Sequence, residues 1–115
     1  MSMIQAGLNT FPTPNLEVLK SLPWKSFCHR WHIAELAVFG SILRDDFSAT
    51  SDIDILVTFE SDARQSLMTL ARIKHELEDM TGREIDILTR PSIEQSHNTA
   101  RKRNILESAK AIYVV

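Results

Sequence analysis

The sequence predicts an α/β (α+β) fold class, in which helices flank a small mixed β-sheet. Three observations support this prediction. Apolar segments at 35–39, 51–60 and 83–89 are short and bounded by turn or charged residues, which is typical of strands. A helical repeat of apolar residues runs over 62–80, between the second and third of these segments. A chain of 115 residues is long enough for one core but not for two.

The two ends of the chain differ in character. Gly7, Pro12 and Pro14 interrupt residues 1–14, which show no periodicity, so we expect a flexible N-terminal arm there. The rest of the chain, 15–115, is expected to form a single domain. The last five residues, AIYVV, are compatible with either a small terminal strand or an apolar tail.

Helix and turn signals define the elements between the strands. In the helix over 62–80, Leu67, Ile73 and Leu77 lie on the face expected to turn inward, and Gly82 is expected to end the helix. The other predicted elements are helices over 16–22, 23–32 and 99–110, a short helix starting at 91, a helical turn over 41–46 and a loop over 47–50.

Composition excludes several classes of function. A net charge of −2 gives no electrostatic basis for bulk nucleic-acid binding. Cys28 is the only cysteine, so an intrachain disulfide and a cysteine-based zinc site are excluded, and such usage suits a reducing cytoplasm. No apolar stretch approaches the length of a membrane span. We therefore expect a cytoplasmic protein that does not interact with membranes.

The segment that begins at Gly40 carries the most chemical information. Asp52 and Asp54 are two residues apart at the start of a predicted strand, so both side chains project from one face. Two neighbouring carboxylates repel each other and are costly to bury without a counter-charge. A divalent cation would stabilise the pair. The alternative is a strand-start cap that forms an ion pair with Arg44 or Arg83.

A third aspartate, Asp86, lies on the predicted strand over 83–89. If this strand lies beside that of Asp52 and Asp54, the three carboxylates can converge on one face. Oxygen-rich clusters of this kind select magnesium or manganese, and magnesium commonly recruits substrate phosphates to complete its shell. The alternative for Asp86 is an ordinary charge on an edge strand, where Glu84 shares its face.

Gly40 and Ser41 follow directly on a predicted strand. A glycine lets the backbone approach a phosphate closely, and the turn after it offers N–H donors. Ser41 adds a hydroxyl, although it could simply cap the turn. Together with the Asp-x-Asp pattern on the next strand, this pair indicates a metal-dependent nucleotide site.

In combination these motifs resemble the minimal nucleotidyltransferase domains of the polymerase-β-like superfamily. The signature of those domains is Gly-Ser, a following Arg-Gly, and Ser-Asp-hydrophobic-Asp on the next strand. The matching elements here are Gly40-Ser41, Arg44-Asp45 and Ser51-Asp52-Ile53-Asp54, with Asp86 on the later strand. The resemblance covers most of the chain, and it implies a polymerase-β-like nucleotidyltransferase fold for the domain over 15–115.

The resemblance also implies roles for these residues. Asp52 and Asp54 would bind magnesium and the triphosphate, and Asp86 would hold the catalytic metal and help to deprotonate the attacking hydroxyl. The implied nucleotide-binding set is Gly40, Ser41, Arg44 and Ser51, in which Gly40 and Ser41 cradle the β- and γ-phosphates and Arg44 braces the loop or neutralises phosphate charge. The implied cofactor is Mg²⁺, with Mn²⁺ as an alternative, and the implied substrate is ATP.

The likeness is greatest to short stand-alone members that act as antitoxins to HEPN-domain ribonuclease toxins. It implies transfer of AMP from ATP to a tyrosine of such a toxin, and it leaves oligomer formation possible. An adenylyl group adds bulk and negative charge, which would block the approach of RNA. The domain has little surface for a separate acceptor pocket, so the partner is expected to complete the acceptor side.

Two other functions stay open at this point. Asp45 stands where the family usually has glycine, which favours a protein that masks its partner by stoichiometric binding without catalysis. A transferase for a small molecule is the weaker alternative, because such enzymes usually carry a second domain. The basic run Arg101-Lys102-Arg103 is either a solvated helix face or a contact for an acidic partner or for phosphates.

Overall fold

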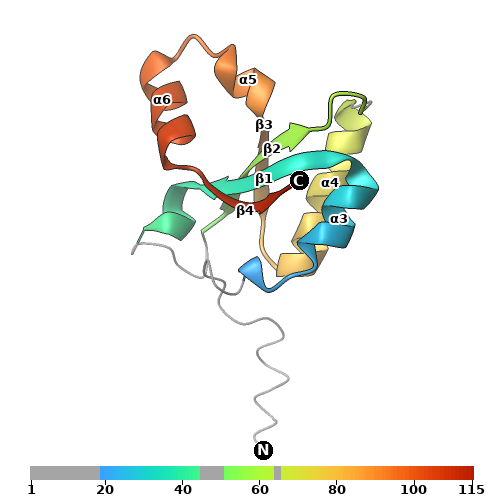
Figure 1. Cartoon of the computed structure of the whole chain (residues 1–115). Coiled ribbons are helices and arrows are strands. Elements are labelled where there is room, and N and C mark those ends of the chain that lie inside the picture. The colour runs from blue at the N-terminus through green and yellow to red at the C-terminus, as the bar shows by residue number, and fades with distance from the viewer. Residues whose placement is uncertain (1–18, 45–50, 64–65) are drawn as a thin grey trace, which may run out of the picture.

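The structure is a computed structural model, and it describes residues 19–44, 51–63 and 66–115. Its centre is a four-stranded sheet in the order β3-β2-β1-β4, shown in Figure 1. The strands β2 and β3 are parallel, whereas β1 pairs antiparallel with both β2 and β4. The predicted mixed sheet is therefore confirmed. The strands are β1 (Ile33–Phe39), β2 (Ile53–Phe59), β3 (Ile85–Thr89) and β4 (Lys110–Val114).

Helices cover both faces of the sheet (Figure 1). The helices α3 (Trp24–Trp31) and α4 (Leu67–Thr81) share a core with the inward side of β2, including Ile53, Ile55 and Val57. On the other face, α5 (Arg90–Glu94) and α6 (Thr99–Ser108) form a smaller core. The residues of that smaller core are Ala37, Phe39, Leu56, Ile93 and Ile105. None of the helices in the described ranges is long and apolar enough to cross a membrane.

The alternation of side chains along β2 determines which residues point to each face of the sheet. Ile53, Ile55 and Val57 are fully buried under α3 and α4, so Asp54 and Leu56 face α5 and α6. The chemistry of the chain therefore lies on the α6 side of the sheet.

The helix α4 begins later than the apolar pattern predicts. It starts at Leu67, because the side chain of Ser66 caps it by accepting a hydrogen bond from the backbone N–H of Thr69 at 3.2 Å. Asp62 is outside the helix, and Leu67 is 85% exposed. The prediction that Leu67 faces inward was therefore wrong. The predicted end of the helix is confirmed, since Gly82 is its C-cap with a φ of 69°.

The C-terminal end of the chain forms a strand rather than a tail. Lys110 pairs with Val38 and Tyr113 with Leu36, so β4 is the antiparallel neighbour of β1. The helix over 99–110 was predicted too long, because it ends at Ser108 before this pairing begins. The pairing holds α6 against the end of β1, which is where the chain turns at Gly40.

Several boundaries of the first half also differ from the predictions. The first strand begins at Ile33 rather than at residue 35, and the predicted turn over 41–46 is the short 3-10 helix η1 (Gly40–Leu43). The predicted arm over 1–14, the start of the first helix, the loop over 47–50 and Asp45 lie outside the described residues.

Candidate functional site

Two parallel strands bring the predicted carboxylates to one face of the sheet. Asp54 of β2 is paired directly with Asp86 of β3, and paired residues of parallel strands point to the same side. Asp52, two residues earlier, shares that side by alternation. The prediction that the strand of Asp86 lies beside the strand of Asp54 is confirmed. The strand β3 is also an edge strand, as the alternative for Asp86 assumed.

The electrostatics of Asp54 show that these charges act on one another. Burial raises the pKa of the Asp54 carboxyl, and the charges of Asp86 and Asp52 raise it further. The charges of Arg44 and Arg101 act in the opposite direction. Ionised Asp54 therefore lacks sufficient positive charge around it within the described part of the chain.

The donor chemistry at this point fits a hard divalent cation. Asp52, Asp54 and Asp86 offer only carboxylate oxygens, and their mutual repulsion would be relieved by a cation. As their side chains stand, however, the described residues contain no group of three or more His, Cys, Asp or Glu arranged to hold a metal. The face carries the right donors, but their side chains would have to rearrange to share one ion.

Gly40 is shaped by its contact with Asp54. The strand β1 ends at Phe39, and the chain turns at Gly40. The φ of Gly40 is 79°, a backbone conformation that residues other than glycine rarely adopt. A Cβ atom at this position would overlap the Oδ2 atom of Asp54. The glycine is therefore required both by the turn and by the close approach of the carboxylate.

The turn η1 presents Ser41 and Arg44 beside this contact. The backbone N–H of Arg44 closes the turn on the carbonyl of Ser41 at 2.9 Å. Phe39 occupies the cap position, and no side chain caps η1 within the described residues. Ser41 therefore does not cap η1 among the described residues. Its half-buried side chain lines a cavity instead.

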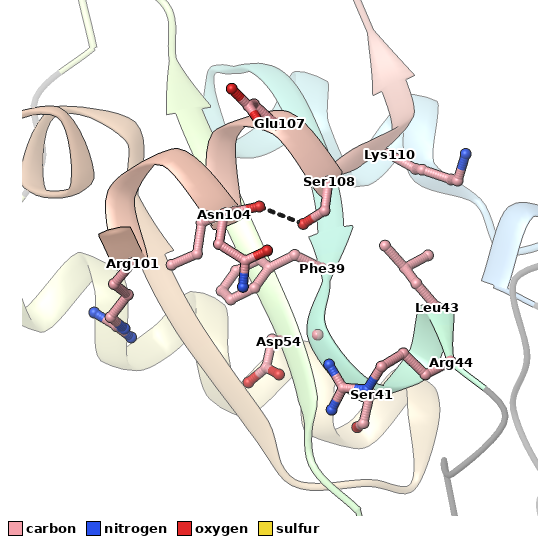
Figure 2. Close-up of a pocket in the computed structure, with 12 residues that line it drawn as sticks. Phe39, Ser41, Leu43, Arg44, Asp54, Arg101, Asn104, Glu107, Ser108 and Lys110 are labelled. Carbon is pink, nitrogen blue, oxygen red and sulfur yellow. Dashed lines mark hydrogen bonds between the residues drawn. The ribbon is translucent and has the colours of Figure 1, made fainter. Parts of the chain in front are cut away.

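The cavity has a volume of about 710 Å³ and lies between η1, Asp54, α6 and the start of β4. This volume is within the range of small-molecule sites. Figure 2 shows Asp54 between Arg101 on one side and Ser41 with Arg44 on the other. Of the seven predicted site residues, those that line the cavity are Gly40, Ser41, Arg44 and Asp54.

The other predicted residues lie outside the cavity lining. Asp52 and Asp86 are exposed on the same face, whereas Ser51 accepts a hydrogen bond at its carbonyl from Nη2 of Arg83 at 2.8 Å. This bond gives Arg83 a structural partner at the start of β2. The predicted roles of Ser51, Asp52 and Asp86 therefore depend on ligands that extend beyond the cavity wall.

Sequence reasoning missed the contribution of α6 and β4. Arg101, Asn104 and Lys110 line the cavity, and all three are distant in sequence from the Gly-Ser and Asp-x-Asp motifs. The only signal was the basic run at 101–103, for which two interpretations were open. The structure separates its members, because Arg101 faces the cavity whereas Lys102 donates to the carbonyl of Glu94 at 2.9 Å.

Residues 22–112 match the family described as the nucleotidyltransferase domain. The chain belongs to this family. It is therefore a member of a transferase family, as the resemblance of its motifs predicted, and the matched region includes every predicted site residue.

Two curated relatives are named as protein adenylyltransferases. A candidate protein adenylyltransferase of Methanocaldococcus jannaschii is 46% identical over 61 residues, which are 53% of this chain and 63% of that protein. The protein adenylyltransferase MntA of Thermococcus cleftensis is 33% identical over 69 residues, which are 60% of this chain and 68% of that protein. The first of these matches thus spans somewhat less than two thirds of the relative.

Solved structures share the fold. The structure of a candidate minimal nucleotidyltransferase has a TM-score of 0.65 and 29% identity, covering 84% of this chain and 95% of that one. The structure of a tri-AMPylated Shewanella oneidensis HEPN toxin in complex with MNT antitoxin matches with a TM-score of 0.56 and 14% identity. The match covers 84% of this chain and 71% of that chain. These matches confirm the predicted minimal nucleotidyltransferase fold.

Proposed function

We propose that this protein transfers AMP from ATP to a tyrosine hydroxyl of a HEPN ribonuclease toxin and thereby acts as its antitoxin. The observation that carries the proposal is the close approach of Gly40 and Asp54 in the wall of a cavity that Arg44 and Arg101 also line. In this arrangement the Gly40 turn, which is suited to binding phosphate, lies beside the Asp54 carboxylate. Two relatives named as adenylyltransferases of proteins support the choice of AMP and of a protein acceptor.

The reaction is an in-line displacement at the α-phosphorus of ATP. The tyrosine oxygen forms a new bond to that phosphorus, the bond to the β-phosphate oxygen breaks, and pyrophosphate leaves. The hydroxyl proton passes to a carboxylate, for which Asp86 is the proposed acceptor. Gly40 and Ser41 would bind the β- and γ-phosphates through backbone N–H groups and a hydroxyl. Arg44 would neutralise part of the phosphate charge, and Ser51 would extend this nucleotide-binding set.

The three aspartates would hold Mg²⁺, with Mn²⁺ as an alternative. Asp52 directly precedes β2, Asp54 lies within β2, and Asp86 is the residue of β3 that pairs with Asp54. A bound divalent cation supplies positive charge that stabilises both the triphosphate and the developing charge of the transition state. The repulsion that raises the pKa of Asp54 is the property that supports cation binding here.

The proposed partner is a HEPN toxin because structures with this fold occur in complexes with such toxins. The cavity is formed by one small domain, and a partner that brings its own tyrosine to the edge of the cavity would complete the acceptor side. Modification by AMP adds a bulky anion near the RNA site of the toxin, which would hinder RNA binding.

The test is co-expression of this protein with the HEPN ribonuclease of the same cells, followed by intact-mass analysis of the toxin. We expect the wild-type protein to restore growth and to add the mass of AMP to the toxin. The variant Asp52→Asn/Asp54→Asn should do neither. The matched control Asp79→Asn changes an exposed carboxylate of α4 and should behave as the wild type does.

Growth that is restored equally by the double variant, with an unmodified toxin, would contradict the proposal. That result would instead favour a protein that masks the toxin by binding. Reversion of Asp45 to the glycine usual for the family would then be the next variant to examine, because an added negative charge near the triphosphate weakens nucleotide binding.

A further inference from the structure

The wall of the cavity opposite the Gly40 turn is formed by α6. Arg101 lies in the first turn of this helix, and its side chain lines the cavity across from Ser41 and Arg44 (Figure 2). The positive charges of Arg101 and Arg44 both act to lower the pKa of Asp54. The guanidinium of Arg101 therefore influences the same carboxylate as the arginine that ends the η1 turn. The sequence alone left the basic run at 101–103 open between a solvated helix face and a contact for an acidic partner or for phosphates.

Two other cations on this face, Lys102 and Arg90, have protein partners among the described residues. Lys102 donates to the carbonyl of Glu94 at 2.9 Å, and Arg90 donates through Nε to Oγ1 of Thr58 at 3.0 Å. Among the described residues, the side chain of Arg101 makes no hydrogen bond or close ion pair. An exposed guanidinium with five donors that faces a cavity is therefore available to a ligand.

The backbone holds Arg101 at this place even though its side chain is exposed. Oδ1 of Asn98 accepts a hydrogen bond from the backbone N–H of Arg101 at 3.1 Å and caps α6. Ile105, one turn further along, anchors the helix in the smaller core. The position of the guanidinium therefore depends on a capped helix packed on the sheet rather than on a free loop.

We propose that Arg101 binds the triphosphate of the nucleotide from the α6 side, so that the phosphates lie between Arg101 and the Gly40 turn. The inference rests on the proposed function, since it requires ATP in the cavity. A guanidinium matches phosphate oxygens by paired, charge-assisted hydrogen bonds. Arg44 and Arg101 would then supply positive charge from two sides, where the aspartates alone would repel a triphosphate.

Calorimetric titration with ATP, ADP and AMP in the presence of Mg²⁺ tests this role. Loss of one charge-assisted phosphate contact in Arg101→Gln should weaken ATP binding by roughly tenfold to a hundredfold. AMP, which lacks the β- and γ-phosphates, should bind with nearly unchanged affinity. Arg101→Lys keeps the charge without the paired donors and should retain part of the ATP affinity. Lys102→Gln, the adjacent position with a protein partner, should bind ATP within twofold of the wild type.

The outcomes separate the two levels of the proposal. ATP binding by the wild type with an unchanged affinity in Arg101→Gln would overturn the role of Arg101 and leave the proposed function standing. An equal loss for AMP and ATP would also overturn it, because the contact would then lie outside the β- and γ-phosphates. A wild-type protein that does not bind ATP would contradict the proposed function and this inference together.

Discussion

Gly40 and Asp54 approach each other closely in the site. The glycine has a positive φ and leaves room for the carboxylate, so the turn and the strand meet without an intervening side chain. Asp54 in turn has a raised pKa because of burial and of two neighbouring carboxylates. A carboxylate with a raised pKa beside a glycine turn favours ligand binding at the expense of stability.

Gly40→Ala should abolish AMP transfer and lower the stability of the fold. The added Cβ would overlap Asp54, and an alanine at positive φ costs roughly 1–2 kcal/mol. The control is Gly82→Ala at the end of α4, where φ is also positive at 69°. It should show the cost of the positive φ alone in urea denaturation, without the overlap with Asp54, and should retain transfer. Equal loss of transfer in both variants would show that Gly40 acts only through stability.

Asp54→Asn should raise the melting temperature at pH 7 while it abolishes transfer. The folded pKa of Asp54 lies above its ordinary value, so ionised Asp54 destabilises the folded state at pH values above the folded pKa. The difference in melting temperature should shrink as the pH falls through that pKa and disappear below the ordinary value of 3.8. Asp79→Asn, with a side chain 73% exposed, is the control. A lower melting temperature for Asp54→Asn at pH 7 would contradict the electrostatic account.

At the scale of elements, α6 is positioned by its two ends. Asn98 caps its first turn, and the strand β4 that follows it pairs with β1. Both constraints hold the helix over the end of β1, where the cavity lies. The stability of the first turn should therefore influence nucleotide binding directly.

Asn98→Ala should weaken ATP binding, because it removes the cap that holds the backbone of Arg101. Ser66→Ala removes the corresponding cap of α4, far from the cavity. Each loss should cost about 1 kcal/mol of stability. Only Asn98→Ala should raise the dissociation constant for ATP in a calorimetric titration. If Ser66→Ala weakens ATP binding to the same extent, loss of a cap weakens binding through the stability of the whole fold and not through the position of Arg101.

The sequence was sufficient for features that depend on neighbours in the chain. Strand alternation separates Asp54 from Ile53 and Ile55, and the Gly-Ser turn is visible as a local motif. Arg101 and Lys110 could not be assigned in this way. They reach the cavity only because β4 pairs with β1, and the apolar residues of β4 alone did not distinguish a strand from a tail.

The start of α4 shows a different reason for error. The apolar residue Leu67 fits the helical repeat of Ile73 and Leu77, so periodicity placed it inside. Leu67 is the first residue of the helix and extends past the edge of the core, where it is 85% exposed. The cap residue Ser66 was the better signal for the start, because a cap reports a local hydrogen bond rather than a packing surface.

In the whole molecule, the sheet separates the larger hydrophobic core from the candidate functional site. The face under α3 and α4 carries the larger core, and the opposite face carries the carboxylates, the cavity and the smaller core. Changes to the charges on the second face should therefore alter ligand binding with little effect on the main core.

Magnesium should stabilise the whole molecule through the three aspartates. A ligand that binds only the folded state raises its stability in proportion to the logarithm of its concentration once binding is saturated. We expect the melting temperature of the wild type to rise with MgCl₂ at constant ionic strength. The melting temperature of Asp52→Asn/Asp54→Asn should not respond. An equal rise in both proteins would indicate a salt effect rather than a site.

We propose that the chain moves the adenylyl group of ATP onto a protein. The most direct measurement supplies ATP labelled at either the α- or the γ-phosphate, with Mg²⁺, to the purified protein and its HEPN partner. We expect label on a partner tyrosine from α-labelled ATP alone, and we expect this label to be lost with a chelator and in Asp52→Asn/Asp54→Asn. Label from γ-labelled ATP, or label that persists in the double variant, would contradict it.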